Sequence, residues 1–133
     1  MTAQRMTWPE TVRWAEEHDL LAMQLFLVQS LPTNGLGPVL DNLGPHVAYQ
    51  VQLEKNGTMF AAGPLADDEA REWKGEGMFI YRANTREEAV KLAEQDPMHV
   101  SGARRFFVRS WLMNEGALNV RVYFSSGNRA QIS

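Results

Sequence analysis

Residues 23–30 read MQLFLVQS, an apolar run with the length of one β-strand. Side chains alternate between the two faces of a strand, and here Phe26 and Val28 alternate with Leu25 and Leu27. Both faces of the predicted strand therefore carry large apolar groups. A strand of this kind predicts a sheet that other parts of the protein cover on both sides.

The segments that follow this strand predict a helix, two strands, a second helix and a last strand. The first helix begins at Pro45 and is stopped by Asn56-Gly57, with glycine in the position that favours a left-handed cap. The second begins at a capping box formed by Thr85 and Glu88. The further strands share short apolar runs and are predicted at 58–62, 78–83 and 105–112. This order is the split βαβ arrangement, so we predict an α+β fold of the ferredoxin-like kind.

Two more segments are predicted outside this arrangement. Thr7 and Glu10 form a capping box at the start of an N-terminal helix. Near the other end, apolar residues alternate through 118–124 and predict a C-terminal strand, after which residues 125–133 are expected to fray. A chain of 133 residues has the size of one domain. We expect residues 1–133 to form a single domain. Within it, the N-terminal helix covers about 8–18 and a C-terminal extension covers 116–133.

The predicted sheet has a second apolar face, because two helices cover only one side of four strands. In the strand at 78–83, Phe79 and Tyr81 alternate with Met78 and Ile80. A bare second face would expose an apolar patch larger than monomeric soluble proteins usually show. We therefore expect a homodimer whose sheets pack face to face. The N-terminal helix or the C-terminal strand could instead cover part of this face.

Composition excludes several classes of function. The net charge of −3 gives no general attraction to nucleic acid, although Arg104, Arg105, Arg109 and Arg121 could form a local positive patch. The absence of cysteine excludes disulfides, thiolate catalysis and Cys-ligated metals. No apolar run has the length of a membrane span, and Met1–Asp19 is too polar for a signal peptide. We expect a cytoplasmic protein that binds neither nucleic acid nor membrane.

His46 is the best candidate for a catalytic residue. It lies in the first turn of the predicted helix, directly after Gly44-Pro45, where free backbone N–H groups create positive potential. This potential disfavours protonation and suits a neutral imidazole that acts as a base. Helical spacing places Tyr49 and Gln50 on the same face. The competing interpretation is a half-exposed histidine at a helix start with no chemical role.

Asp96 and His99 lie at the end of the second helix. Asp96 precedes a proline, so it could be only a turn former. A carboxylate close to an imidazole would instead orient the ring for acid–base catalysis. The two helices are expected to place His46 and Asp96 at opposite edges of the domain. Contact then requires that residues 96–102 bend into the cleft or that a partner subunit supplies the acid, and His99 could be the nearer neighbour.

Two further sets of residues could contact a substrate. Gly63-Pro64 closes a predicted strand, which indicates a tight turn or a close backbone approach. Arg105 and Arg109 share one strand face with two aromatic residues and could hold an anionic aromatic substrate. Such a stripe is also typical of a solvated or dimer-contact face. The acidic residues at 67–72 lack the spacing of a calcium loop, and no metal site is predicted.

Several short motifs occur together in a characteristic order. They include His46-Val47-Ala48-Tyr49 at a helix start, residues 60–65 (FAAGPL), and residues 93–97 (AEQDP). Residues 85–89 (TREEA) and 109–111 (RSW) complete the set, and residues 96–99 (DPMH) with 111–116 (WLMNEG) are similar to a longer subgroup. With these motifs the sequence resembles the YciI-like (YCII-related) family. The resemblance extends from about Met23 to Glu115, and we take this range as the core shared with the family.

The resemblance implies a dimeric α+β barrel and a His–carboxylate site that falls on His46 and Asp96. Related enzymes eliminate chloride from chlorinated hydroxyquinones, and related barrels include muconolactone isomerases. The implied function is cofactor-independent proton abstraction, with elimination or isomerisation, on a small aromatic or lactone-like compound. The residues assigned to substrate or to assistance in this hypothesis are His99, Tyr49, Gly63, Pro64, Arg105 and Arg109. The alternative is a non-catalytic ligand-binding or accessory module that uses the same cleft. Heme chemistry lacks support, because no histidine stands out as an axial ligand.

Overall fold

The computed structural model describes residues 4–125 and 130–133. Contacts within the chain separate two compact units. One unit is Gln24–Leu112, and the other combines the described parts of Met1–Met23 and Met113–Ser133. Each unit is described by itself below.

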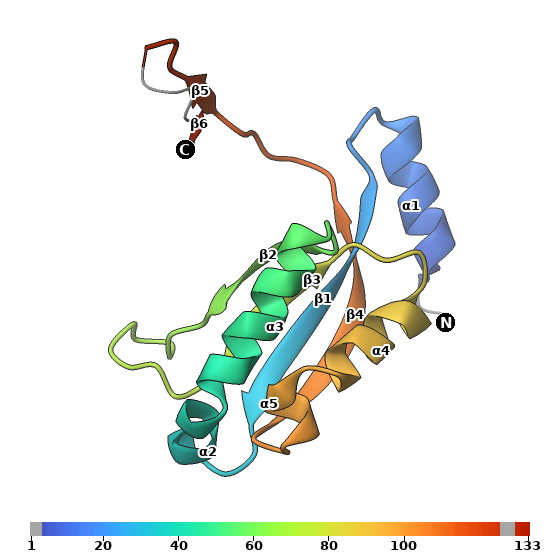
Figure 1. Cartoon of the computed structure of the whole chain (residues 1–133). Helices are drawn as coiled ribbons and strands as arrows, with labels where there is room; N and C mark the ends of the chain where they lie inside the picture. The colour runs from blue at the N-terminus through green and yellow to red at the C-terminus, as the bar shows by residue number, and fades with distance from the viewer. Residues whose placement is uncertain (1–3, 126–129) are drawn as a thin grey trace. The chain divides into compact units, whose positions relative to one another are not determined.

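The larger unit is built on one four-stranded sheet (Figure 1). Its strands are β1 (Met23–Pro32), β2 (Met59–Pro64), β3 (Gly77–Tyr81) and β4 (Arg104–Met113), in the order β2-β3-β1-β4. β3 is antiparallel to both of its neighbours. With the connecting helices this is the split βαβ arrangement. The predicted ferredoxin-like α+β fold is confirmed.

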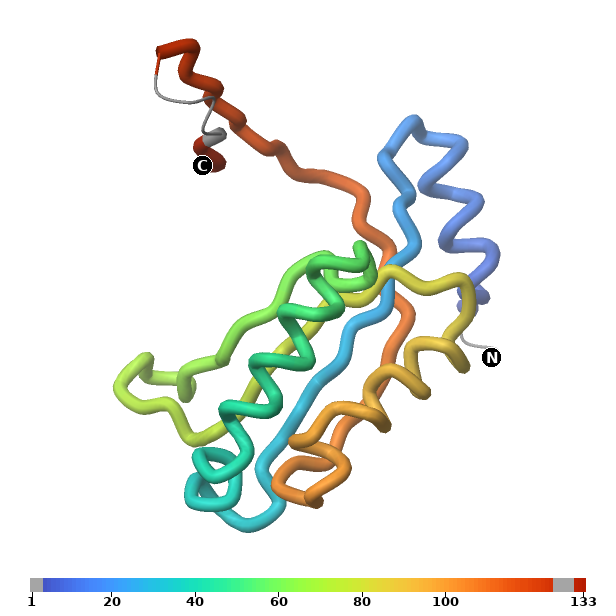
Figure 2. Tube along the Cα trace, in the orientation of Figure 1, coloured from blue at the N-terminus to red at the C-terminus, as the bar shows by residue number. Residues whose placement is uncertain are grey.

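Helices α3 (Leu43–Lys55) and α4 (Arg86–Glu94) lie on the same face of this sheet (Figure 1). The short helix α2 (Leu36–Asp41) precedes α3, and α5 (Pro97–Val100) follows α4. Each long helix returns along the strand before it, and the two strands concerned, β1 and β3, are antiparallel neighbours. The two helices therefore run in opposite directions, and α3 contacts α5, the short helix directly after the end of α4 (Figure 2). The expectation that the start of α3 and the end of α4 lie at opposite edges of the domain was wrong, because it overlooked the antiparallel pairing of β1 with β3.

The core lies between the sheet and the two helices. Phe26 pairs with Tyr81 and Val28 with Phe79 across β1 and β3, and all four are buried. Side chains from the helices and from β4 complete this cluster, namely Leu53, Ala89, Ala93 and Val108. Burial of each large side chain contributes about 1.5–3 kcal/mol. The alternation expected from the sequence therefore sets which face of the sheet meets the helices.

Local sequence signals end and begin the helices of this unit. Gly57 follows α3 with φ +85°, the left-handed conformation predicted for the cap. The Thr85 hydroxyl accepts a hydrogen bond from the Glu88 backbone N–H at the start of α4. The second half of that predicted capping box does not form, because the Glu88 carboxylate accepts from the Asn84 N–H instead.

The described residues of the smaller unit form one helix and one pair of antiparallel strands. Helix α1 (Trp8–Glu17) begins with the complete capping box predicted from Thr7 and Glu10. Strand β5 (Val120–Val122) pairs with β6 (Ala130–Ile132). The prediction that residues 125–133 fray is wrong for β6, because these three residues pair with β5. A segment of three residues is too short for its sequence to indicate a strand. Residues 126–129 of the predicted frayed segment lie outside the described residues. No helix in the described parts of the chain combines the length and the apolar character needed to cross a bilayer.

Candidate functional site

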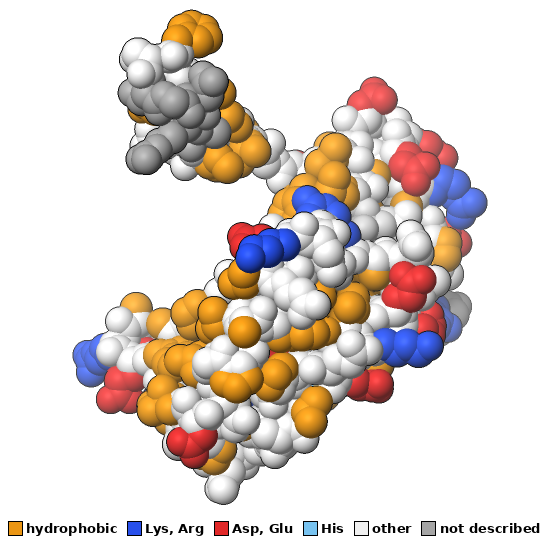
Figure 3. Space-filling view, viewed as in Figure 1, with side chains coloured by type: hydrophobic (Ala, Val, Ile, Leu, Met, Phe, Trp, Pro, Cys, Tyr) orange, Lys and Arg blue, Asp and Glu red, His pale blue; other side chains and the backbone are white. Residues whose placement is uncertain are grey.

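A pocket of about 450 Å³ opens beside the first turns of α3 in the larger unit. Its apolar walls come from α3, from the loop before β3 and from β3 itself, and include Leu43, Val47, Trp73 and Phe79. Its polar lining consists of His46, Gln50 and Arg104. Hydrophobic side chains gather over α3 and the neighbouring β2 on this face (Figure 3). A small concave site with apolar walls and few polar groups is the usual form of a small-molecule site.

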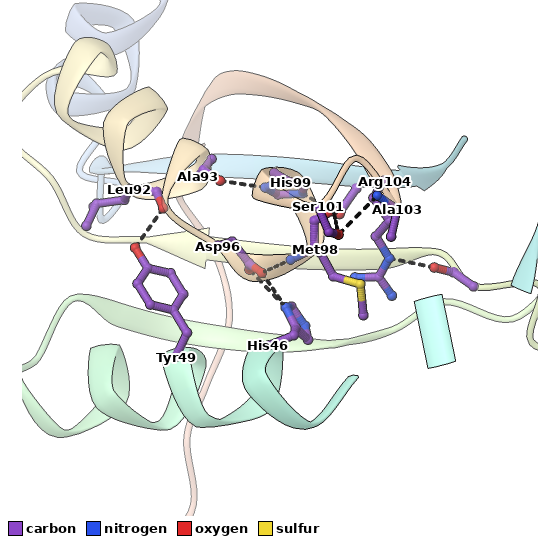
Figure 4. A network of polar contacts seen from close by, with 12 residues as sticks. His46, Tyr49, Leu92, Ala93, Asp96, Met98, His99, Ser101, Ala103 and Arg104 are labelled. Atoms are coloured by element: carbon purple, nitrogen blue, oxygen red, sulfur yellow. Dashed lines mark hydrogen bonds and ion pairs between the residues drawn. The ribbon is translucent and has the colours of Figure 1, made fainter. Parts of the chain in front are cut away.

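His46 and Asp96 form a buried pair at this pocket (Figure 4). The Nδ1 atom of His46 lies 2.8 Å from one carboxylate oxygen of Asp96 and 2.9 Å from the other. Only 5% of His46 and none of Asp96 is exposed. The interpretation of His46 as a half-exposed helix-start residue is therefore wrong. Contact within one subunit, which the sequence left open, is made in this chain.

The pairing fixes which nitrogen of His46 is available. The ionised Asp96 carboxylate only accepts hydrogen bonds, so Nδ1–H donates and the Nε2 atom of a neutral ring keeps its lone pair. Nε2 makes no hydrogen bond within the described residues. His46 also packs against Phe79, with ring centroids 5.3 Å apart. The arrangement thus supplies an oriented base at the wall of an apolar pocket.

Asp96 reaches His46 because it caps the short helix that follows α4. Its backbone is extended, with Pro97 as the first residue of α5. One carboxylate oxygen accepts a hydrogen bond from the Met98 N–H at 2.9 Å. The turn-forming role and the pairing role, which were alternatives in the sequence, are both present. Residues 97–100 form α5, which contacts α3 and keeps the Asp96 carboxylate beside the first turns of that helix.

His99 and Tyr49, the expected assistants, do not line the pocket. His99 Nδ1–H donates to the Ala93 carbonyl at 2.6 Å, and its Nε2 accepts from the Ser30 hydroxyl at 2.7 Å. Burial lowers the pKa of His99, which favours this neutral form. The Tyr49 hydroxyl donates to the Leu92 carbonyl at 2.7 Å, and burial raises its pKa. Both side chains tie neighbouring elements together.

The expected substrate-contacting residues divide into two groups. Gly63 and Pro64, at the end of β2, line the pocket. Arg105 and Arg109 are exposed and do not line it. Side chains alternate along β4, so these two arginines point away from the helices, and Arg104 takes the position on the pocket side.

Arg104 is the functional candidate that sequence reasoning missed. It is only 3% exposed, and its Nε–H donates to the Gly75 carbonyl at 2.7 Å. Burial lowers the pKa of Arg104, yet guanidinium groups stay charged at neutral pH. A signal was present in the sequence, because Arg104 is in phase with Phe106 and Val108 on the strand and shares their face.

The described residues contain no group of three or more His, Asp or Glu side chains that could hold a metal ion. The polar groups of the pocket are instead one imidazole, one carboxamide and one guanidinium. This set suits binding of oxygen atoms and transfer of a proton. It offers acid–base and hydrogen-bonding chemistry to a small organic molecule.

A comparison of the sequence with known families agrees with this fold. Residues 23–112 match the YCII-related domain. The chain therefore belongs to the YCII-related family, as the resemblance indicated. The matched range coincides closely with the larger unit, Gln24–Leu112.

A solved structure of similar fold is the 5-chloro-2-hydroxyhydroquinone dehydrochlorinase from Burkholderia phenoliruptrix, in complex with 2,5-dihydroxybenzoquinone. The two chains are 24% identical, with a TM-score of 0.53. The similarity covers 65% of this chain and 92% of the dehydrochlorinase. At this identity it shows a shared fold. The sequence matches no curated protein at a significant level.

Proposed function

We propose that this protein is a cofactor-independent acid–base enzyme that removes a proton from a small aromatic or lactone-like compound. The observation that carries the proposal is the contact of both Asp96 oxygens with His46 Nδ1 at the wall of the pocket. A histidine held in this way presents one defined nitrogen, Nε2, to a bound molecule. A positioned base of this kind typically contributes a factor of about 100–10,000 in rate.

The proposed step is a proton abstraction followed by elimination or isomerisation. His46 Nε2 takes a proton from the substrate, and the released electron pair forms a new π bond. In an elimination, the leaving group departs with its bonding electrons. In an isomerisation, the protonated ring returns the proton to another atom of the same molecule. The buried Asp96 carboxylate stabilises the imidazolium that forms in between.

The substrate class is supported by the family and by the pocket. The structural neighbour is named for dehydrochlorination of a chlorinated hydroxyhydroquinone, and its structure holds a dihydroxybenzoquinone. The pocket of this chain has a volume of about 450 Å³ and aromatic walls from Trp73 and Phe79, which suit one small ring. We therefore propose hydroxylated aromatic or quinonoid compounds, halogenated ones included, as the first substrates to test.

The test is turnover of such compounds by the purified protein. Chloride release and ring absorbance would be followed for 5-chloro-2-hydroxyhydroquinone and for non-halogenated lactones. We expect turnover by the native chain and its loss in His46→Gln. His18→Gln is the matched control, because this exposed histidine lies in the smaller unit, where its Nδ1 is 2.7 Å from the Trp14 carbonyl oxygen. Equal turnover by His46→Gln and the native chain would refute the proposal.

The competing proposal, a binding module without catalysis, predicts a different pair of results. Such a module would bind the same compounds at the same pocket and convert none of them. Ligand binding measured by calorimetry, together with the absence of product over hours, would favour it. Binding with turnover that depends on His46 favours the enzyme.

We also propose that the protein forms a homodimer through the sheet face turned away from α3 and α4. Met78, Phe107 and Trp111 alternate with core-facing residues of β3 and β4, and more than a third of each is exposed. Neighbouring apolar groups of this size on one sheet face are typical of an interface.

A further inference from the structure

The pocket contains a buried guanidinium, that of Arg104, which forms no ion pair with any of the described residues. Its Nη1 atom is buried and has no hydrogen-bond acceptor among residues 4–125 and 130–133. Burial of an unpaired charge or donor costs free energy, and folded proteins usually avoid it. A group of this kind at a pocket wall is explained most simply by a ligand atom that completes it.

No carboxylate of the described residues forms an ion pair with Arg104. Asp96 is close enough to raise the pKa of Arg104 by its charge, but its oxygens are held by His46 and by the Met98 N–H. The guanidinium charge therefore remains uncompensated by direct contact. The missing partner is an anion.

The guanidinium is also held in a fixed orientation. Its Nε–H donates to the Gly75 carbonyl at one side. On the other side it lies against Gly77, where a Cβ atom would meet Nη1 at 3.0 Å and a Phe79 ring carbon at 3.1 Å. Glycine at this position thus makes room for the charged group. A donor that is positioned before the ligand arrives loses little entropy on binding.

A second unpartnered donor lines the same pocket. The Nε2 atom of Gln50 is buried and has no hydrogen-bond acceptor in the part of the chain that the structure describes. Gln50 lies four residues after His46 on α3, so one helix face carries both side chains into the pocket. Arg104, Gln50 and His46 thus line one cavity. A bound molecule would supply an acceptor oxygen to each of the two unpaired donors and a proton to His46.

We propose that Arg104 binds an anionic oxygen of the ligand and that Gln50 binds a second oxygen of the same molecule. The ligand class is a small ring that bears a carboxylate or an ionised phenol or enol. This inference rests on the proposed function of the pocket and specifies the charge of its substrate. Arg104 holds the anion, and His46 Nε2 remains available for the proton.

The test uses two probes of nearly equal size, benzoate and its neutral counterpart benzamide. Each would be titrated into the native protein, with the backbone amide signals of Gly63 and Gly77 followed by NMR. We expect saturable shifts with benzoate and an affinity for benzamide that is roughly 10–100 times weaker, the effect of losing one charge-assisted hydrogen bond. Equal affinities, or no saturable shift with benzoate, would overturn the proposal.

Variants assign this preference to Arg104. Arg104→Gln should abolish the preference for benzoate, whereas Arg105→Gln removes the same charge on the opposite face of β4 and should leave it intact. Because Arg104 is buried, Arg104→Gln could fail to fold. Gly77→Ala keeps the charge but displaces the guanidinium, and it should weaken benzoate binding as well. A benzoate preference that survives in folded Arg104→Gln and in Gly77→Ala would also overturn the proposal.

The two proposals fail separately. His46→Gln should abolish turnover and keep the preference for benzoate. If benzoate is preferred but no compound is ever converted, the anion site stands and the enzyme proposal fails. If turnover depends on His46 while benzoate and benzamide bind equally, the enzyme proposal stands and the anion site fails.

Discussion

Both carboxylate oxygens of Asp96 lie within hydrogen-bond distance of His46 Nδ1, at 2.8 and 2.9 Å, although the two residues are 50 positions apart in the chain. One oxygen also caps α5 through the Met98 N–H. The buried Asp96 carboxylate therefore orients the His46 ring. It also stabilises the start of α5, which positions the carboxylate next to that ring. Stability and chemistry are coupled at this residue, and substitutions can separate them.

Asp96→Asn and Asp96→Ala should differ in stability but not in activity. The amide of Asn keeps an oxygen that can accept from Met98 N–H, whereas Ala removes this cap at a further cost of about 1 kcal/mol. Neither variant presents a carboxylate to Nδ1–H, so both should lose turnover by about 100-fold or more. Thermal unfolding and initial rates measure the two effects. Full activity in Asp96→Asn would contradict the role of the carboxylate.

The stability of the protein should fall as pH drops below about 6.5 because of His99. Burial lowers the pKa of His99 in the folded protein, while the charge of Asp96 acts in the opposite direction. The unfolded chain therefore binds a proton at a higher pH than the folded chain. The stabilisation is fully present above the ordinary pKa of 6.5 and is lost as the pH falls towards the lower folded value.

Urea unfolding at pH 7.5 and at pH 5 measures this dependence. The difference between the two pH values should be smaller in His99→Gln than in the native chain and should persist in His18→Gln, where the exposed histidine is replaced. If His99→Gln leaves the pH dependence of stability unchanged, a group other than His99 causes it.

Gly57→Ala should destabilise the protein. Gly57 has φ +85°, so alanine there is strained and should cost about 1 kcal/mol, although no atom lies within 4 Å of the added Cβ. Chemical denaturation measures the free energy of unfolding of both proteins. An unchanged free energy of unfolding would show that this position accepts alanine without strain.

The homodimer should depend on the exposed sheet face. Sedimentation of the native chain at micromolar concentration should show a dimer, whose interface would bury well over roughly 1,000 Å². Phe107→Glu places a charge on that face and should produce a folded monomer, whereas Glu54→Gln on α3 should not. A stable, well-folded native monomer under these conditions would remove the proposal.

Local patterns in the sequence determined the elements of this protein. Alternation in 23–30 predicted a strand with two apolar faces, and the structure places Phe26 and Val28 against the helices. The capping box at Thr7 and the glycine stop at Gly57 gave one helix start and one helix end, because these signals act over a few residues. The order of these elements was enough to predict the fold.

Tertiary structure alone decided how the site is assembled. The sequence identified His46 and Asp96 as candidates but not their contact, since the antiparallel pairing of β1 with β3 sets the directions of both helices. It also selected Arg105 and Arg109 on β4 as substrate contacts and missed Arg104. One residue of register separates Arg104, which is buried at the pocket, from Arg105, which is exposed. Local propensity fixes where an element begins and ends, but packing against distant residues determines which side chain faces the pocket.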